Sequence, residues 1–337
     1  MTPERTIVPP SSTVHVGTAD ARARARAALA RFGPDDADLA ARAVVAGDAS
    51  GWPEFGLGLL VRELRAHPVP PGSASPGSAS TEGTSTGNAP GTEPVLSTGA
   101  TATLDARHVP GPVALAAAAR LAGDRARRQG VGVVAVRHAG GTGRVGAYVR
   151  ALAEGGLVGV ALAHSGPTVA PYGGTAAVVG TNPVAVAVPR TGADGALVLD
   201  AATSALTLAG VRRHGRDGSP LPEGAALDAA GRPTRDAGEI AAILPAGLLG
   251  SLLGLTVETL AGLVSGARGD DEGRGLWVLA LDPRAFGADD LPDRAEHLVR
   301  DWSDAGGHVP GSRPDAAEFD VDRDVWDALG ELAEAGA

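Results

Sequence analysis

The sequence predicts an α/β protein with a central sheet and a helical region formed from both chain ends. In the middle of the chain, aliphatic runs of strand length alternate with amphipathic helical patterns. Towards both ends, helical patterns occur without such runs. Between the first helices and the strands lies a stretch without large side chains. We therefore expect a helical region from residues 1–67 and 288–337, an insertion at 68–96 and an α/β domain at 97–287.

Helices are expected at both ends of the chain. The N-terminal ones are predicted at residues 21–32, 35–47 and 56–66. The second begins at Pro34-Asp35-Asp36, where proline and acids are favoured in the first turn. Near the C-terminus, apolar residues recur at helical spacing at Val321, Val325, Leu329 and Leu332. We expect this last amphipathic helix to dock on the N-terminal ones.

The segment at residues 68–91 consists almost entirely of small and polar residues, and Val69 is its only large aliphatic. Such a segment cannot bury enough apolar area to offset the entropy of ordering it. We therefore predict that the insertion at 68–96 is flexible.

In the central part of the chain, segments with helical spacing of apolar residues alternate with short aliphatic runs typical of buried strands. Helices are predicted at residues 113–129, 144–155 and 244–265, the last of them long and buried. Strands are predicted at 131–136, 157–162, 178–180, 184–188, 196–199 and 275–282. Helices between buried strands indicate an α/β core with some parallel pairing.

The composition excludes several kinds of chemistry. The chain has neither cysteine nor lysine, which rules out thiol nucleophiles, disulfides, cysteine-bound metals, lysine Schiff bases and the Walker phosphate lysine. Lys, Asn, Ile and Met are scarce while Ala, Arg, Gly and Pro abound, which indicates a GC-rich coding sequence. The net charge of −10 argues against a nucleic-acid partner.

We expect the protein to be soluble and cytoplasmic. Residues 1–12 lack the apolar core of a signal peptide. The most apolar stretch, residues 244–267, contains Glu258 and glycines at positions 247, 250, 254 and 262, among others, which favours a buried helix over a membrane span. No residues have metal-ligand spacing, so no metal site is predicted.

The run Gly141-Thr142-Gly143-Arg144-Val145-Gly146 is a G-x-G-x-x-G that follows a predicted strand and opens a helix. A dinucleotide fold also requires an acidic residue at the end of the next strand. That strand ends in Leu162-Ala163-His164-Ser165, without an acid. In so glycine-rich a chain we interpret the run as a chance match.

A longer set of motifs carries a different resemblance. Two of them are Gly180-Thr181-Asn182-Pro183 and Leu199-Asp200-Ala201-Ala202-Thr203-Ser204. Others occur, in the same order and spacing, at residues 130–148, 156–161, 167–174, 222–234, 260–267 and 280–283. Together they resemble the malate/lactate/ureidoglycolate dehydrogenase-like family of NAD(P)-dependent 2-hydroxy-acid and 2-imino-acid oxidoreductases, whose cofactor fold is not a Rossmann fold.

The resemblance implies a mixed central sheet of the malate/L-lactate dehydrogenase-like type, which binds NAD(P), beside the helical region. It also implies a dimer that shares the cofactor site. Cofactor-binding positions carried over from it are Gly143, Ser165, Thr181, Asn182, Pro183, Asp200, Thr203 and Ser204. The same residues also suit turns and strand caps, so two readings stay open, one with NAD(P) bound and one with the cofactor lost.

The chain departs from the family where the catalytic groups belong. The family's Gly-His-x-Ser-His-Gly, with an arginine three residues on, becomes Gly51-Trp52-Pro53-Glu54-Phe55-Gly56 with Leu59. Its Asn-x-Asn-His-Phe-Gly has Gly141 for histidine, and its Gly-His-Lys-Gly-Tyr-Gly has Leu248 and Leu249 for histidine and lysine. The lost family positions are Phe55, Leu59, Gly141, Leu248 and Leu249.

These replacements remove the groups that hydride transfer to a 2-oxo acid requires. The developing alkoxide must be protonated, and the substrate carboxylate must be held by a cation. Codon bias explains why Leu249 is not lysine, but a chain with 29 arginines had another cation available. The candidate acid–base residues that remain are Glu54, His138 and His164. Their alternative interpretation is an acid at a helix start and two locally hydrogen-bonded histidines.

Three functions are compatible with these observations. The first is an altered enzyme, non-redox chemistry included, for a small or apolar substrate in a specialised pathway. The second is a pseudoenzyme that pairs with an active paralogue, as a heteromer in place of a homodimer. The third is a divergent NAD(P)H-dependent 2-oxo-acid or 2-imino-acid reductase using Glu54, His138 or His164 as proton donor. Apolar residues at Phe55, Leu59, Leu248 and Leu249 count against the third.

Overall fold

The computed structural model of the chain describes residues 12–68, 92–192, 195–268, 273–311 and 315–336. The expectations for the first eleven residues, and for all but the ends of the flexible insertion, lie outside the described residues.

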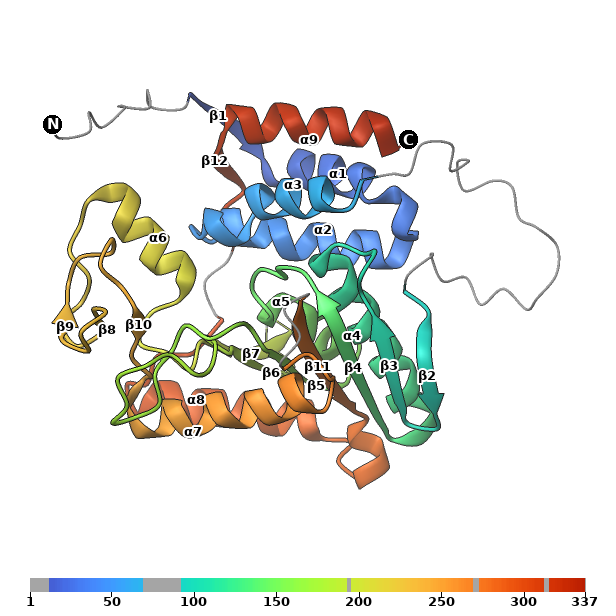
Figure 1. The fold of residues 1–337 in the computed structure, drawn as a ribbon. Coiled ribbons are helices and arrows are strands. Elements are labelled where there is room, and N and C mark those ends of the chain that lie inside the picture. The colour runs from blue at the N-terminus through green and yellow to red at the C-terminus, as the bar shows by residue number, and fades with distance from the viewer. Residues whose placement is uncertain (1–11, 69–91, 193–194, 269–272, 312–314, 337) are drawn as a thin grey trace, which may run out of the picture.

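A mixed seven-stranded sheet forms the centre of the molecule, in the order β2-β3-β4-β11-β5-β6-β7 (Figure 1). The strands are β2 (Pro94–Thr98), β3 (Thr101–Asp105), β4 (Val131–Ala139), β5 (Val158–Ala163), β6 (Val184–Pro189), β7 (Ala196–Ala201) and β11 (Arg274–Leu281). Only β3 and β4 pair in parallel, and the other neighbours are antiparallel. The predicted α/β class with a mixed sheet is confirmed, and the order is not that of a Rossmann fold.

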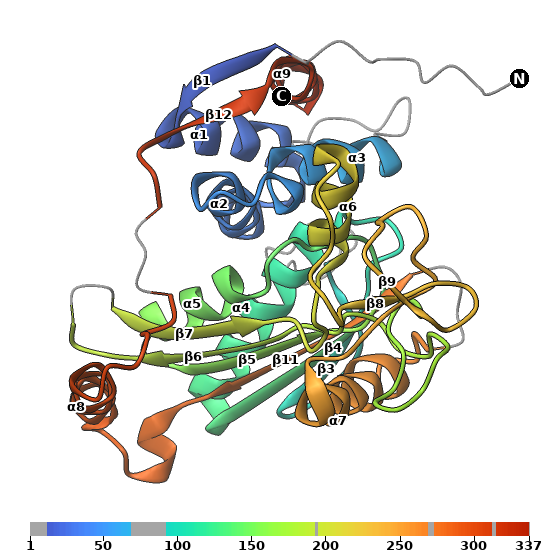
Figure 2. The same cartoon turned by 90° about the vertical axis from the view of Figure 1, so that its left-hand side faces the viewer.

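Helices cover both faces of this sheet (Figure 2). On one face lie α4 (Gly111–Gln129) and α5 (Gly146–Glu154), and on the other α7 (Gly247–Val257), the π-helical turn η3 (Glu258–Leu263) and α8 (Leu291–Asp304). The 3-10 turn η4 (Pro283–Phe286) connects β11 to α8. Much of the buried side of α4 is alanine, which allows its backbone to lie close to the strands.

A helical region lies above α4 and α5 and is built from both chain ends (Figure 2). Its elements are α1 (Thr18–Ala28), η1 (Ala30–Phe32), α2 (Pro34–Ala49), η2 (Pro53–Phe55), α3 (Leu57–Ala66) and α9 (Arg323–Gly336). Strand β1 (Thr13–Gly17) pairs antiparallel with β12 (Glu318–Asp322) and joins the ends. The predicted docking of the last helix on the first ones is confirmed, although Val321 belongs to β12 and not to the helix.

Two of the expected domain boundaries differ from the structure. Helix α8 lies within the segment 288–337 that we assigned to the helical region, but it packs against β6 of the sheet. Its narrow buried stripe, Ala295 and Val299, has the spacing of a helix on a sheet face. Residues 94–96, which we assigned to the insertion, begin strand β2 at the sheet edge.

The remaining elements lie beside the sheet (Figure 1). They are α6 (Leu208–Asp217) and a small three-stranded sheet of β8 (Ala226–Leu227), β9 (Pro233–Thr234) and β10 (Ala242–Ile243). The strand predicted at residues 178–180 is only an isolated bridge between Val169 and Val179.

The apolar stretch at residues 244–265 forms α7 and η3, but α7 is not the buried helix that we predicted. Leu248 and Leu249 are 55% and 69% exposed. The side of α7 that faces the protein carries Gly250, where an added Cβ would lie 2.5 Å from the Thr203 carbonyl oxygen. Because the side of α7 that packs on the protein has room only for glycine at position 250, Leu248 and Leu249 lie on the opposite, solvent-exposed side of the helix. Among the described residues, no helix is long and apolar enough to cross a membrane.

Candidate functional site

A cleft of about 390 Å³ lies where the helical region meets the sheet. Its walls come from η2 and α3, from the loop between β4 and α5, from the ends of β5 and β7, and from the start of α6. Five of its lining residues were named from the sequence as cofactor positions: Gly143, Ser165, Thr181, Pro183 and Asp200. The structure therefore brings residues from distant parts of the chain to one concave site.

Glu54 lies in the wall of this cleft, on η2. Its Oε1 accepts a hydrogen bond of 2.7 Å from Arg216 of α6, and its side chain is only 7% exposed. Among the described residues, its other oxygen, Oε2, is buried and has no hydrogen-bond partner. This hydrogen bond raises the pKa of the Arg216 guanidinium. A buried carboxylate oxygen without a partner is costly in a fold and available to a ligand.

Positive charge surrounds the same cleft. Four arginines line it, namely Arg62, Arg144, Arg212 and Arg274, together with the three carboxylates Glu54, Glu63 and Asp200. Arginine presents a planar fork of donors that matches a carboxylate or a phosphate. The cleft therefore offers cations for an anionic ligand, and Leu59, where we expected the family's arginine from the sequence, lies among them in the lining.

The glycine-rich loop in the cleft is held by Glu63 of α3. The Glu63 carboxylate accepts hydrogen bonds from the backbone N–H of Gly111 at 3.1 Å and of Gly141 at 2.8 Å. A Cβ added at Gly140 would lie 1.9 Å from Glu63 Oε2. Here glycine allows the Glu63 carboxylate to reach the backbone of the loop.

Asp200 and Arg144 form an ion pair at the floor of the cleft, with 3.2 Å between Asp200 Oδ2 and Arg144 Nε. Burial raises the pKa of Asp200, while Arg144 and a hydrogen bond from the backbone N–H of Gly146 act in the opposite direction. Arg144 also donates to Ser50 Oγ at 3.2 Å. The pair ties the end of β7 to the start of α5 and to α2.

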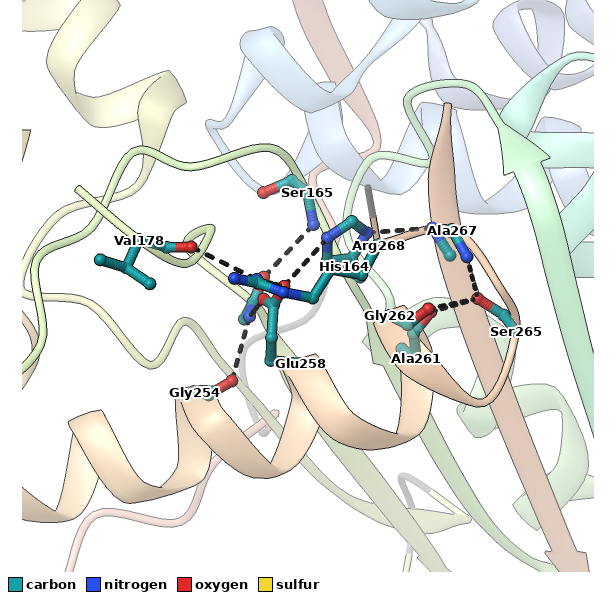
Figure 3. A network of polar contacts seen from close by, with 12 residues as sticks. His164, Ser165, Val178, Gly254, Glu258, Ala261, Gly262, Ser265, Ala267 and Arg268 are labelled. Carbon is teal, nitrogen blue, oxygen red and sulfur yellow. Dashed lines mark hydrogen bonds and ion pairs between the residues drawn. The ribbon is translucent and has the colours of Figure 1, made fainter. Parts of the chain in front are cut away.

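His164 faces the cleft but is engaged in a buried network (Figure 3). Its Nδ1 accepts from the backbone N–H of Gly275 and its Nε2 contacts Glu258 Oε1, both at 3.3 Å. Asn182 donates to Glu258 Oε2 at 2.9 Å, and Arg268 bonds to the same carboxylate. With both ring nitrogens engaged, His164 has no nitrogen left for a substrate proton.

Glu258 is the centre of that network and is 2% exposed. Burial alone would raise its pKa, but the hydrogen bonds from His164, Asn182 and Arg268 lower it to about 2. The carboxylate is therefore ionised and joins η3 to the ends of β5 and β6. A π-helical turn is often found beside functional sites, and here it places Glu258 below the cleft.

The cofactor positions carried over from the resemblance separate into two groups. Ser165 lines the cleft, and among the described residues its buried Oγ has no hydrogen-bond partner. Asn182, Thr203 and Ser204 are outside the lining and bond within the protein, for example Thr203 Oγ1 to the Thr181 carbonyl oxygen at 3.1 Å. Asn182, Thr203 and Ser204 therefore stabilise turns, which is the alternative to cofactor binding that the sequence left open.

His138 lies away from the cleft, at the end of β4. Its Nδ1 is 2.8 Å from Asp105 Oδ1, and Arg107 contacts the ring. Burial acts to raise the pKa of Asp105, but the hydrogen bonds and charges of His138 and Arg107 together outweigh it and leave that pKa below its usual value. The ring is thus a member of an ion cluster outside the cleft lining.

Of the five positions at which we expected the family's catalytic groups to be replaced, Phe55, Leu59 and Gly141 line the cleft. Leu248 and Leu249 do not, since they lie on the exposed side of α7. The cations Arg62, Arg212 and Arg274 were missed in the sequence analysis, because an arginine in an arginine-rich chain has no local signature. Within the described parts of the chain, no cluster of three His, Asp or Glu side chains is placed to hold a metal ion.

Asp48 lies next to this site, on α2, and it is buried. Its Oδ2 accepts a hydrogen bond of 2.7 Å from the backbone N–H of Leu57. Burial, aided by the charge of Glu54, raises its pKa to about 7. A raised pKa in the fold adds stability at low pH, and this contribution is lost as the pH rises from about 4 to 7.

Asp48→Asn should therefore flatten the pH dependence of stability. Asparagine keeps the hydrogen bond to Leu57 but does not ionise, so relative to wild type the variant should gain up to about 4 kcal/mol between pH 4 and pH 8. Urea unfolding across this range measures the difference, with Asp35→Asn, exposed on the same helix, as control. If the difference in unfolding free energy between Asp48→Asn and wild type were the same at all pH values, the raised pKa of Asp48 would be contradicted.

Solved structures with the same fold are dehydrogenases and reductases. The chain is 26% identical to a dehydrogenase from Sinorhizobium meliloti, with a TM-score of 0.74, covering 96% of this chain and 99% of that one. It is also 26% identical to delta1-piperideine-2-carboxylate reductase from Pseudomonas syringae, with a TM-score of 0.74, covering 95% and 99%. The fold is thus shared with proteins named as a dehydrogenase and a reductase.

The chain belongs to the malate/L-lactate dehydrogenase family, whose model matches residues 16–317. It is 38% identical over 160 residues to a malate dehydrogenase of Pyrococcus abyssi, covering 44% of each chain. It is 37% identical over 214 residues to a Delta(1)-pyrroline-2-carboxylate reductase of Pseudomonas fluorescens, covering 58% of this chain and 63% of the relative. A (2R)-3-sulfolactate dehydrogenase (NADP(+)) of Chromohalobacter salexigens is 35% identical over 226 residues, covering 62% and 67%. The aligned part thus spans about half to two thirds of these relatives.

Proposed function

We propose that this chain is an oxidoreductase with altered proton-transfer chemistry. It would interconvert a small 2-hydroxy acid and the matching 2-oxo acid, or a 2-imino acid and its amine, with NAD(P) as the hydride partner. The observation that carries the proposal is the buried Oε2 of Glu54, which has no partner within the described parts of the chain, in a cleft lined by four arginines. Family membership supports the redox class, and the site supports a carboxylate in the role that the family gives to histidine.

The cleft suits a nicotinamide nucleotide on two observations. The Ser165 hydroxyl is buried and without a partner among the described residues, and Thr181 lies beside it in the lining. Gly143 has a φ of +76°, and a Cβ there would meet the Phe55 carbonyl oxygen at 2.9 Å, so glycine allows the loop before α5 to lie close against η2 in the wall of the cleft. Ser165, Thr181 and this loop would hold the cofactor, which supplies or accepts a hydride when bound.

Glu54 would take the proton. In the oxidation direction, an arginine of the cleft holds the substrate carboxylate, and the substrate hydroxyl donates to Glu54 Oε2. The O–H bond breaks as the carbonyl forms, the proton passes to Glu54 and the hydride leaves the carbon atom, so that two electrons and two hydrogens are removed. Because Arg216 already occupies Oε1, Oε2 is the oxygen that would accept the substrate proton.

The contacts of the two histidines favour Glu54 over either of them. His164 uses one ring nitrogen on Gly275 and the other on Glu258. His138 is bound to Asp105 outside the cleft lining. The apolar family positions on α7 no longer count against a reductase, because Leu248 and Leu249 do not line this cleft.

The proposal is tested by two measurements on the purified protein. Calorimetry measures the binding of NADPH and NADH, and absorbance at the nicotinamide band follows turnover with C3 and C4 2-hydroxy acids and their oxo acids. Binding with turnover is the expected result. Binding without turnover in either direction would overturn the redox proposal in favour of non-redox chemistry on the same scaffold. The absence of binding would favour a pseudoenzyme that has lost the cofactor.

We also propose that two copies of this chain pair through the exposed face of α7 and η3. Most of its large apolar side chains are more than half exposed: Leu248, Leu249, Leu252, Leu255, Leu263 and Val264. Contiguous apolar patches on a soluble protein commonly mark an interface, and the dimer implied by the sequence resemblance supplies an occupant.

Leu249→Arg should convert this dimer to a monomer, because it places a charge in a desolvated interface. Light scattering after size exclusion measures the mass. Leu298→Arg, at a leucine of α8 that is 57% exposed, is the matched control and should leave the dimer intact. A monomeric wild type would overturn the proposal, and co-purification with a paralogue instead would support the heteromer.

A further inference from the structure

A second cavity, of about 490 Å³, adjoins the cleft on the side of α2 and α5. The two share Trp52, Arg144 and Asp200 in their linings. The ion pair of Arg144 and Asp200 therefore lies at the boundary between them. An elongated ligand with one end in the cleft would pass this pair and place its other end in the second cavity.

The second cavity is rich in cations. Its lining includes four arginines, Arg22, Arg42, Arg144 and Arg150, against three carboxylates, Glu154, Asp200 and Asp315. The cations come from α1, from α2, from α5 and from the loop before α5, so the fold gathers them from distant parts of the chain. In a protein with a net charge of −10, such a positive excess in a concave site favours an anion.

The two arginines at the far side of this cavity are paired to different degrees. Arg22 is 3.4 Å from Asp315, and among the described residues its buried Nε has no hydrogen-bond partner. Arg42 pairs with Asp38 of its own helix at 3.0 Å and lies 3.7 Å from Glu154. Arg22 therefore keeps a donor for an anion, and Arg42 adds positive charge beside it.

We propose that this second cavity binds the phosphate-bearing adenosine half of NADP(H), with Arg22 and Arg42 contacting the 2′-phosphate. The inference rests on the proposed function, and it assigns the cofactor preference that the family leaves open. A 2′-phosphate is a dianion that arginine forks recognise, whereas a free ribose 2′-hydroxyl is held by a carboxylate. Here each of the three lining carboxylates already faces an arginine. The chain therefore prefers NADP(H) to NAD(H).

Binding measurements on the full chain test this assignment without reference to turnover. In calorimetry, NADPH should bind at least about tenfold more tightly than NADH, and Arg22→Ala or Arg42→Ala should remove roughly ten- to hundredfold of NADPH affinity while leaving NADH affinity unchanged. Arg26→Ala is the matched control, one turn further along α1 and exposed. Thermal unfolding of each variant shows that the fold is kept.

Two competing probes separate a nucleotide from a bare anion. Adenosine 2′,5′-bisphosphate should compete with NADPH, while adenosine 5′-monophosphate and inorganic phosphate should compete at least tenfold less well. Competition by inorganic phosphate as strong as by the bisphosphate would overturn the nucleotide assignment. Equal affinity for NADPH and NADH would overturn the preference and leave the proposed function standing. Failure of both to bind would overturn the proposed function itself.

Discussion

Glu54→Gln will lower turnover by a factor of about 10²–10⁴ and leave cofactor affinity unchanged. Glutamine has the same length, and its amide oxygen still accepts the hydrogen bond from Arg216. It cannot take the substrate proton, so only the chemical step suffers. The measurements are kcat for oxidation of the best 2-hydroxy acid and calorimetric binding of NADPH.

Two further variants test whether the loss of turnover is due to the Glu54 carboxylate itself. Glu223→Gln removes an exposed carboxylate elsewhere and should leave kcat unchanged. Glu54→Asp keeps the acid with a shorter reach and should retain more activity than Glu54→Gln. Unchanged kcat in a folded Glu54→Gln protein would exclude Glu54 as the proton acceptor.

Glu258→Ala will cost about 3–5 kcal/mol of unfolding free energy. The carboxylate is buried, and its loss leaves His164, Asn182 and the guanidinium of Arg268 without their shared acceptor. Urea unfolding at pH 7 measures the change. Glu331→Ala, exposed on α9, is the control and should change stability by less than about 0.5 kcal/mol.

The loss of unfolding free energy in Glu258→Ala should also depend on pH, because the Glu258 carboxylate is stabilised in its ionised form. Because the pKa of Glu258 falls from 4.5 to about 2 in the fold, its ionised form stabilises the protein above pH 4.5, and this contribution is lost as the pH falls towards 2. The difference in unfolding free energy between wild type and Glu258→Ala should therefore become smaller as the pH falls from 4.5 to 2. A gap that stays constant from pH 6 to pH 3 would show that Glu258 contributes by packing and not by charge.

The helices and the buried strands were predictable because their signal is local. The aliphatic runs that became β4 and β5, and the helical spacing of α4, are contained within a few residues of sequence. Strands β1 and β12 were missed, since each is short and lacks an aliphatic run, and the register that makes them a pair joins opposite ends of the chain. Whether a leucine of α7 points inward also depends on tertiary packing, here on the glycine at position 250.

The candidate site was predictable only where a motif marked it. The family pattern led to Phe55, Leu59 and Gly141, which do meet in one cleft. The contact of Glu54 with Arg216 joins residues 162 positions apart, and no local pattern announces such a pair. Likewise, the leucine at position 59 was visible in the sequence, while the gathering of four arginines from different elements around the cleft was not.

The pairing of β1 with β12 has a consequence for the order of assembly. His15 lies opposite Asp320, 305 residues later, and closing a loop of that length costs about 5 kcal/mol of chain entropy. During synthesis, α1 to α3 leave the ribosome long before the strand and the helix that complete their packing. The helical region that carries Glu54 is thus completed last, because α9, which packs on α1 and α3, is made only when nearly all of this chain has been synthesised.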